Sequence, residues 1–114
     1  MTSVWVHIDS IDTDHFSLAG TISGCTPAYA AMFIEALGDA GVMFGLSREQ
    51  SYRFASQVLV GTGKLAQINK EHPGKMKDNV CSPGGTTIRG VAKLEEKGFR
   101  SAIIEAIKAI EDKK

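Results

Sequence analysis

The stretch Pro27-Ala28-Tyr29-Ala30-Ala31-Met32-Phe33-Ile34 decides the fold of this chain. Proline suits the first turn of a helix and the preceding Thr26 is a good N-cap residue, so a helix is predicted from residue 27 to about residue 41. The first part of this helix is apolar on every side, which is typical of a helix that is buried all round. A domain of 114 residues rarely encloses a helix completely, so we expect another subunit to cover part of it.

A second long helix is predicted directly after it. Ser47-Arg48-Glu49-Gln50 has the pattern of a capping box, with Ser47 at the N-cap and Gln50 three residues later. Apolar or small side chains then recur at three- and four-residue steps up to about residue 69, which indicates one helix face. They are Tyr52, Ala55, Val58, Leu59, Thr62, Leu65 and Ala66.

Glycines interrupt both of these helices. Gly38, Gly41 and Gly45 weaken the end of the first, and small residues there also let a neighbouring helix approach closely. Gly61 and Gly63 lie inside the second, where each costs roughly 1 kcal/mol relative to alanine. We interpret this pair as small residues packed against another helix.

The remaining segments are also helical in pattern. Further helices are predicted over residues 12–22, 73–79, 86–97 and 100–113, with Asp12, Thr13 and Asp14 capping the first and Gly98 ending the third in a left-handed cap. Residues 4–8 alternate apolar and polar side chains, and we interpret them as a short extended N-terminal segment. The sequence therefore predicts one all-α domain over residues 1–114, a bundle of about five to six helices interleaved with a second subunit.

Composition excludes several classes of function. Lys+Arg and Asp+Glu are 13 each, so the net charge of zero argues against a general electrostatic grip on nucleic acid or on an anionic membrane. No stretch approaches the roughly 20 apolar residues that cross a bilayer. No basic start followed by an apolar run marks a signal peptide, so we expect a cytoplasmic protein.

Residues that could carry chemistry are scattered. His7, His15 and His72 have no partner at metal-ligand spacing, so we interpret them as surface or capping histidines and expect no metal. Cys25 and Cys81 are interpreted as small buried thiols rather than nucleophiles. The run Val60-Gly61-Thr62-Gly63-Lys64 fails as a phosphate-binding loop, because Val58 and Leu65 occupy positions that require Gly and Ser or Thr.

The strongest functional signal is Val80-Cys81-Ser82-Pro83-Gly84-Gly85-Thr86-Thr87, which leads into a predicted helix. The first N–H groups of a helix lack internal partners and carry partial positive charge, so such a place accepts a carboxylate or phosphate. The alternative is an ordinary helix start, built from residues that cap helices and make turns. Three hydroxyl side chains and two adjacent glycines exceed what a cap requires, which favours the anion site.

These residues resemble a known family, the C-terminal domain of Δ1-pyrroline-5-carboxylate reductase. The resemblance is carried by four motifs: Ser23-Gly24-x-x-Pro27-Ala28-Tyr29, Asp39-Ala40-Gly41-Val42-x-x-Gly45-Leu46-x-Arg48, His72-Pro73-x-x-Met76-Lys77-Asp78-x-Val80-x-Ser82-Pro83-Gly84-Gly85-Thr86-Thr87-Ile88, and Leu94-Glu95-x-x-Gly98-Phe99-Arg100. They span nearly the whole chain.

The resemblance implies a function for the loop. In the family, this helical domain forms a homodimer and accompanies a Rossmann domain that binds NADP or NAD, and dimers assemble further in some members. It implies that the loop holds the carboxylate of a cyclic imino acid at the dimer interface, with Thr87 near the ring nitrogen as the catalytic residue. The substrate-binding set carried over is Val80, Ser82, Gly84, Gly85, Thr86 and Thr87.

The chain also departs from the family pattern. Cys25-Thr26 stands where Ser-Gly is usual, Cys81 stands where Thr or Ser is usual, and Lys70 stands where some members carry an acid. The Rossmann domain is absent, so we expect a fragment or proteolytic product that binds no cofactor and reduces nothing alone. Two hypotheses follow: the substrate-binding and dimerisation part of a reductase, or a non-catalytic helical interaction module of a reductase paralogue.

Overall fold

The computed structural model of the chain describes residues 15–113, and this part contains six helices and no strand. They are α1 (Phe16–Gly24), α2 (Pro27–Met43), α3 (Arg48–Asn69), α4 (Pro73–Asn79), α5 (Thr86–Glu96) and α6 (Phe99–Glu111). The all-α prediction is confirmed, and the helices begin and end close to the predicted positions. The predicted extended segment at residues 4–8 and the caps at residues 12–14 lie outside the described residues.

Local signals account for some of the helix ends. Gln50 N–H donates to Ser47 Oγ at 3.1 Å and Ser47 N–H donates to the Gln50 side chain at 3.3 Å, so the predicted capping box at the start of α3 is confirmed. Gly98 has φ +78°, the left-handed conformation predicted for it between α5 and α6. Lys70 ends α3 in the same conformation with φ +52°, which is uncommon for a residue with a Cβ.

One predicted cap is wrong. Thr26 precedes α2 and Pro27 occupies its first turn, but the Thr26 hydroxyl caps no N–H group of α2. It donates instead to the backbone carbonyl of Ile22, one turn back. The reason is that Cys25 and Thr26 both keep right-handed helical backbone angles, so α1 runs almost directly into α2 and no extended N-cap residue separates them.

The tightest packing lies where α2 crosses α3. A Cβ at Gly38 would come within 2.1 Å of the Tyr52 ring, and a Cβ at Gly41 would come within 2.2 Å of Ser51 Oγ. Both glycines are therefore required for this approach, as predicted. Ser51 and Ala55 of α3 are buried here, 4% and 3% exposed.

An exposed polar clamp joins the same two helices. Arg48 of α3 donates to the Asp39 carboxylate of α2 at 2.8 Å and to the Tyr52 hydroxyl at 3.0 Å. These two hydrogen bonds, the one to Asp39 first, raise the pKa of Arg48. Because all three groups are accessible to water, the clamp fixes the geometry of the crossing more than it adds to stability.

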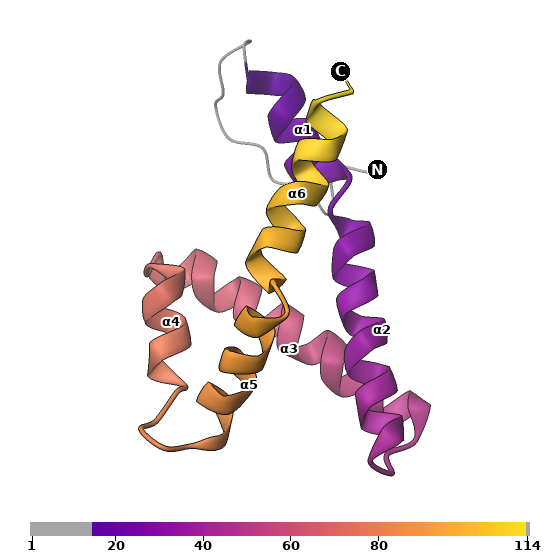
Figure 1. Ribbon diagram of the computed structural model, residues 1–114, viewed down its shortest axis with the longest axis vertical. Helices are drawn as coiled ribbons and strands as arrows, with labels where there is room; N and C mark the ends of the chain where they lie inside the picture. The colour runs from indigo at the N-terminus through magenta and orange to yellow at the C-terminus, as the bar shows by residue number, and fades with distance from the viewer. Residues whose placement is uncertain (1–14, 114) are drawn as a thin grey trace.

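The helices form an open frame rather than a closed bundle (Figure 1). α1 packs beside α6, and α5 packs against the start of α6. α3 runs behind these elements from α2 to α4, so α2 and the α4–α5 pair lie on opposite sides of the molecule. The radius of gyration is 16.1 Å, against about 13 Å for a compact domain of this length.

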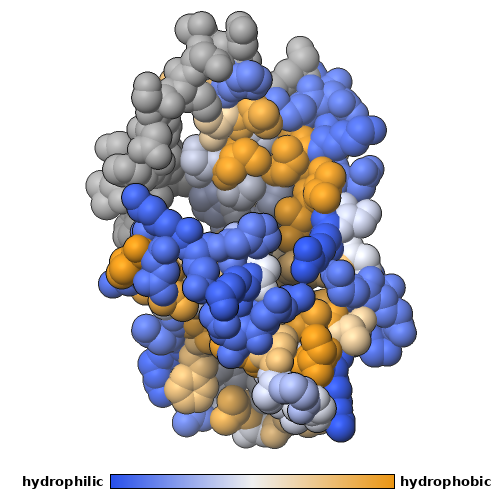
Figure 2. Space-filling view, turned by 90° about the vertical axis from the view of Figure 1, so that its left-hand side faces the viewer, coloured by the Kyte–Doolittle hydropathy of each residue, from blue (hydrophilic) through white to orange (hydrophobic). Residues whose placement is uncertain are grey.

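The open frame leaves apolar side chains without cover. Among the described residues, Ala55 is the one apolar side chain that is buried, while Met32, Phe54 and Ile68 are 63%, 52% and 76% exposed. Apolar surface lies among hydrophilic surface on the side that carries α4 (Figure 2). The packing predicted for Gly61 and Gly63 is not made among residues 15–113, because outside the adjoining helix backbone no atom lies within 4 Å of a Cβ built on either residue. The second half of the α3 stripe is therefore open.

Candidate functional site

The turn between α4 and α5 is shaped by its own sequence. α4 closes with Val80 N–H donating to the Lys77 carbonyl and Cys81 N–H donating to the Asp78 carbonyl, both at 3.1 Å. Gly85 N–H then donates to the Ser82 carbonyl at 3.0 Å, which closes a four-residue turn. Proline in its second position and Gly84 with φ +72° in its third follow the type II pattern, which requires glycine or asparagine there.

Gly85 brings the Ser82 side chain onto the start of α5. A Cβ at Gly85 would lie 2.6 Å from Ser82 Oγ and 3.2 Å from the Ser82 carbonyl oxygen, so any larger residue displaces the serine. Gly85 itself is the N-cap of α5, with extended backbone angles. The two adjacent glycines therefore have separate uses: Gly84 makes the turn and Gly85 makes the close approach.

The hydroxyl groups of this loop do not cap the helix that follows. α5 begins without a side-chain cap, and Ser82, Thr86 and Thr87 make no hydrogen bond through their hydroxyls to any described residue. All three residues are exposed. The loop therefore has the turn of an ordinary helix start but not its side-chain cap. The first N–H groups of α5 and three hydroxyls are left facing water.

The loop gathers all the residues predicted from the sequence. Val80 is 66% exposed, Gly84 is exposed and Gly85 is half-buried. The six residues are consecutive or nearly so, and the turn folds them around the N-terminus of α5. N–H groups, hydroxyls and the positive end of the helix dipole form a surface of donors suited to a carboxylate.

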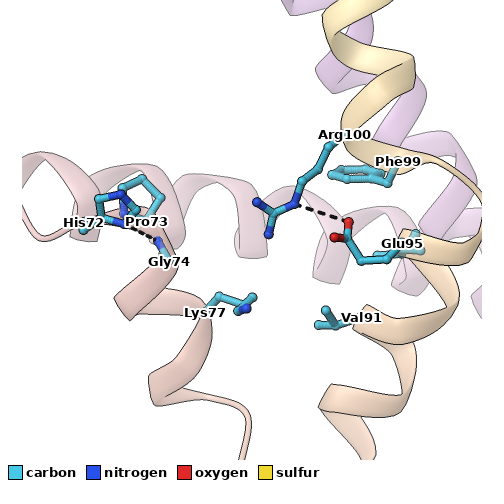
Figure 3. A pocket seen from close by; sticks show the side chains of 9 residues that line it. His72, Pro73, Gly74, Lys77, Val91, Glu95, Phe99 and Arg100 are labelled. Carbon is cyan, nitrogen blue, oxygen red and sulfur yellow. Dashed lines mark hydrogen bonds and ion pairs between the residues drawn. The ribbon is translucent and has the colours of Figure 1, made fainter.

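A cavity of about 430 Å³ lies elsewhere, between α4, α5 and the start of α6 (Figure 3). None of the loop residues lines it. Its lining consists of His72, Pro73, Gly74, Lys77, Val91, Leu94, Glu95, Phe99 and Arg100. This cavity could not be predicted from the sequence, because helical spacing places Val91, Leu94 and Glu95 near one face but does not say which helix lies opposite.

The histidines and cysteines give mixed outcomes. His72 Nδ1 accepts the Gly74 N–H at 2.9 Å and His15 is exposed, so both are capping or surface residues as predicted, while His7 lies outside the described residues. Cys25 is exposed, so its predicted burial is wrong, since the direct passage from α1 to α2 leaves it on the surface. Cys81 is half-buried.

Two further kinds of site are absent from residues 15–113. No group of three or more histidine, cysteine or acidic side chains could hold a metal ion there. Within the same residues, none of the helices has the length and apolar character needed to span a membrane.

Comparison with known proteins identifies relatives of this chain. The sequence profile described as pyrroline-5-carboxylate reductase dimerisation matches residues 13–114. The pyrroline-5-carboxylate reductase of Treponema pallidum is 55% identical over 102 residues, which is 90% of this chain and 39% of that protein. The enzyme of the same name from Escherichia coli is 57% identical over 86 residues, 75% of this chain and 32% of that protein.

Solved structures agree with these relatives. The pyrroline carboxylate reductase of Plasmodium falciparum, solved with NADP bound, superposes with a TM-score of 0.86 at 39% identity and covers 93% of this chain and 43% of that one. The 1-pyrroline-5-carboxylate reductase of Streptococcus pyogenes superposes with a TM-score of 0.87 at 32% identity, over 92% of this chain and 40% of that one.

The chain spans less than two fifths of the length of these two curated relatives. The family profile nevertheless matches almost all of this chain and leaves out only its first 12 residues. This chain belongs to the pyrroline-5-carboxylate reductase dimerisation family.

Proposed function

We propose that this chain is the substrate-binding and dimerisation part of a pyrroline-5-carboxylate reductase, which reduces 1-pyrroline-5-carboxylate to proline. The loop at residues 82–87 holds the substrate carboxylate. The hydride comes from NADPH or NADH, which another domain of the enzyme holds, so the chain alone has no reductase activity. The enzyme works in the cytoplasm.

The observation that carries this proposal is the uncapped start of α5 with its three unused hydroxyls. Each hydrogen bond from such a donor to a carboxylate contributes about 1.5–3 kcal/mol, and the helix dipole adds about 0.3–1 kcal/mol. Two or three such bonds suit micromolar to millimolar recognition of a small acid. Val80, Ser82, Gly84, Gly85 and Thr86 form the binding set.

Thr87 is the residue that we assign to catalysis. It follows Thr86 in the first turn of α5, it is exposed, and its hydroxyl makes no hydrogen bond to any described residue. A hydroxyl both donates and accepts, so it can orient the ring nitrogen of the imino acid while that nitrogen gains or keeps a proton. An interaction that strengthens in the transition state raises the rate of the chemical step.

The open frame supports a second subunit. The chain exposes 9041 Å², whereas a compact monomer of 12.2 kDa exposes about 6,000 Å². The excess is several times the roughly 800 Å² that each partner buries in a standard interface. A homodimer that covers α2 and the second half of α3 accounts for the exposed apolar side chains.

Proline, the product, tests the binding part of the proposal on this chain. Titration with proline, followed by amide chemical shifts, is expected to move Gly84, Gly85 and Thr87 and to leave Gly61 unchanged. Pyrrolidine, which has the ring without the carboxylate, is the matched control and is expected to leave the loop unchanged.

A dimeric chain whose loop does not respond to proline would contradict the binding proposal. It would favour the alternative, a helical interaction module without catalytic function. A loop that responds equally to proline and pyrrolidine would contradict the carboxylate assignment, because the donors of the loop would then not be selecting the acid.

A further inference from the structure

One face of α2 combines apolar side chains with an acid that has no ion pair among the described residues. Ala28, Met32, Glu35 and Asp39 recur at steps of four, three and four residues, so they lie on one helix face. Met32 is 63% exposed. Asp39 is held by Arg48, but Glu35 is exposed and makes no ion pair or hydrogen bond to any described residue.

The cavity between α4, α5 and α6 has the complementary chemistry. Its apolar part comes from Val91, Leu94 and Phe99. Lys77 from α4 points toward Val91 and Glu95 of α5 across the cavity (Figure 3). A helix face with exposed methionine and one carboxylate would therefore find apolar surface and a cation in this cavity.

The polar groups of the cavity are mainly donors. His72 Nδ1 accepts the Gly74 N–H, so in the neutral ring Nε2 carries the hydrogen and donates. Arg100 Nε lies 3.3 Å from the Glu95 carboxylate, so the one acid in the lining already has a partner. Lys77 Nζ lies 3.3 Å from the exposed carboxylate of Asp78, the next residue in the chain. Because that carboxylate is open to water, Lys77 is the cation of the lining that is best placed to pair with a further acid.

We propose that the cavity between α4, α5 and α6 receives the Ala28, Met32 and Glu35 face of α2 from a second copy of the chain, with Glu35 paired to Lys77 across the interface. The proposal rests on the dimer proposed above and specifies which surfaces meet. One chain carries both surfaces, so a two-fold dimer makes the contact twice. The pair also gives the exposed acid of α2 a partner when that helix is covered.

Charge exchange tests the pair. In the chain itself, Glu35→Lys and Lys77→Glu each place like charges together at two symmetric contacts, which is expected to raise the dimer dissociation constant by about a hundredfold or more. The double variant Glu35→Lys/Lys77→Glu restores opposite charges and is expected to return the constant to within about fivefold of the wild-type value. The constants are measured by sedimentation equilibrium, with helicity checked by circular dichroism.

Matched controls lie on the same kinds of surface. Lys75→Glu changes a lysine of α4 outside the cavity lining, and Glu105→Lys changes an exposed acid of α6 without an ion pair to any described residue. Both are expected to leave the dissociation constant nearly unchanged. Glu35→Gln removes the charge with little change of shape and is expected to weaken the dimer less than Glu35→Lys, even if a reversal variant folds poorly.

The outcomes separate this proposal from the dimer itself. A wild-type chain that is monomeric at micromolar concentration overturns both. A stable dimer whose constant does not respond to Glu35→Gln, Glu35→Lys or Lys77→Glu overturns the pairing alone. Single variants that weaken the dimer without rescue in the double variant also overturn it, because the two side chains would then act at separate places.

Discussion

Glycines and hydroxyl side chains occur both at the α2–α3 crossing and in the α4–α5 turn, but they have opposite roles in the two places. At the crossing, side chains of α3 occupy the space beside Gly38 and Gly41, and the hydroxyl of Ser47 caps α3. At the turn, Gly84 has open space around it and the hydroxyls of the loop cap nothing among the described residues. Close packing and a hydroxyl in use as a cap make a structural joint, whereas exposed donors without a partner on a fixed backbone are open to a ligand.

Filling the crossing is expected to have the largest effect. In Gly38→Val the new side chain would overlap the Tyr52 ring, so we expect a loss of about 3 kcal/mol in the free energy of unfolding, measured by urea denaturation at fixed protein concentration. Gly20→Val in α1, where a Cβ meets no other side chain or distant backbone atom within 4 Å, is the control and is expected to change stability by less than about 0.5 kcal/mol. Equal losses in the two variants would contradict the distinction between closed and open glycines.

Removing a hydroxyl from the turn is expected to affect catalysis rather than folding. Thr87→Ala in the full-length reductase should lower kcat/KM for pyrroline-5-carboxylate by roughly ten- to a hundredfold, because a contact made in the transition state is lost. Ser101→Ala, which removes an exposed hydroxyl of α6, should leave kcat/KM unchanged. An unchanged value for Thr87→Ala in steady-state assays would remove Thr87 from the mechanism.

The left-handed glycine of the turn is expected to have the next largest effect. Gly84→Ala keeps the open surroundings but forces a Cβ into φ +72°, which costs about 1–2 kcal/mol of stability. The change should also weaken proline binding, since the turn positions the N–H groups of α5. Thermal unfolding and the amide titration measure the two effects, and a stable variant with normal proline binding would show that the turn does not need this conformation.

The two helix starts provide the finest comparison. Ser47→Ala removes a cap that is in use and should cost about 1 kcal/mol of stability. Ser82→Ala removes a hydroxyl that is not in use and should change stability by less than about 0.3 kcal/mol, while it weakens proline binding. If Ser82→Ala destabilised the chain as much as Ser47→Ala, the loop hydroxyl would be structural after all.

Sequence reasoning succeeded where the deciding contacts are short in range. Capping by Ser47, the left-handed Gly98 and the turn around Gly84 each depend on residues within about four positions of one another, so they can be read from neighbouring letters. The close approach at Gly38 was also predicted, because glycines in a helix interior need a compensating reason. The error at Thr26 arose because two helices run together there and leave no extended residue to act as a cap.

The sequence by itself determined a set of about five to six helices, the cap of α3, the left-handed Gly98 and a donor-rich turn before α5, because interactions between near neighbours fix all of these. Only the tertiary structure decided which glycines have another helix packed against them and which have open space beside them. It alone also brought α4, α5 and α6 around a cavity. Those outcomes depend on side-chain volumes and helix directions from distant parts of the chain, which no local pattern contains. For the apolar stretch at residues 27–34, sequence and tertiary structure both contribute. Its composition predicted a surface for a partner, and the open arrangement of the helices left that surface uncovered.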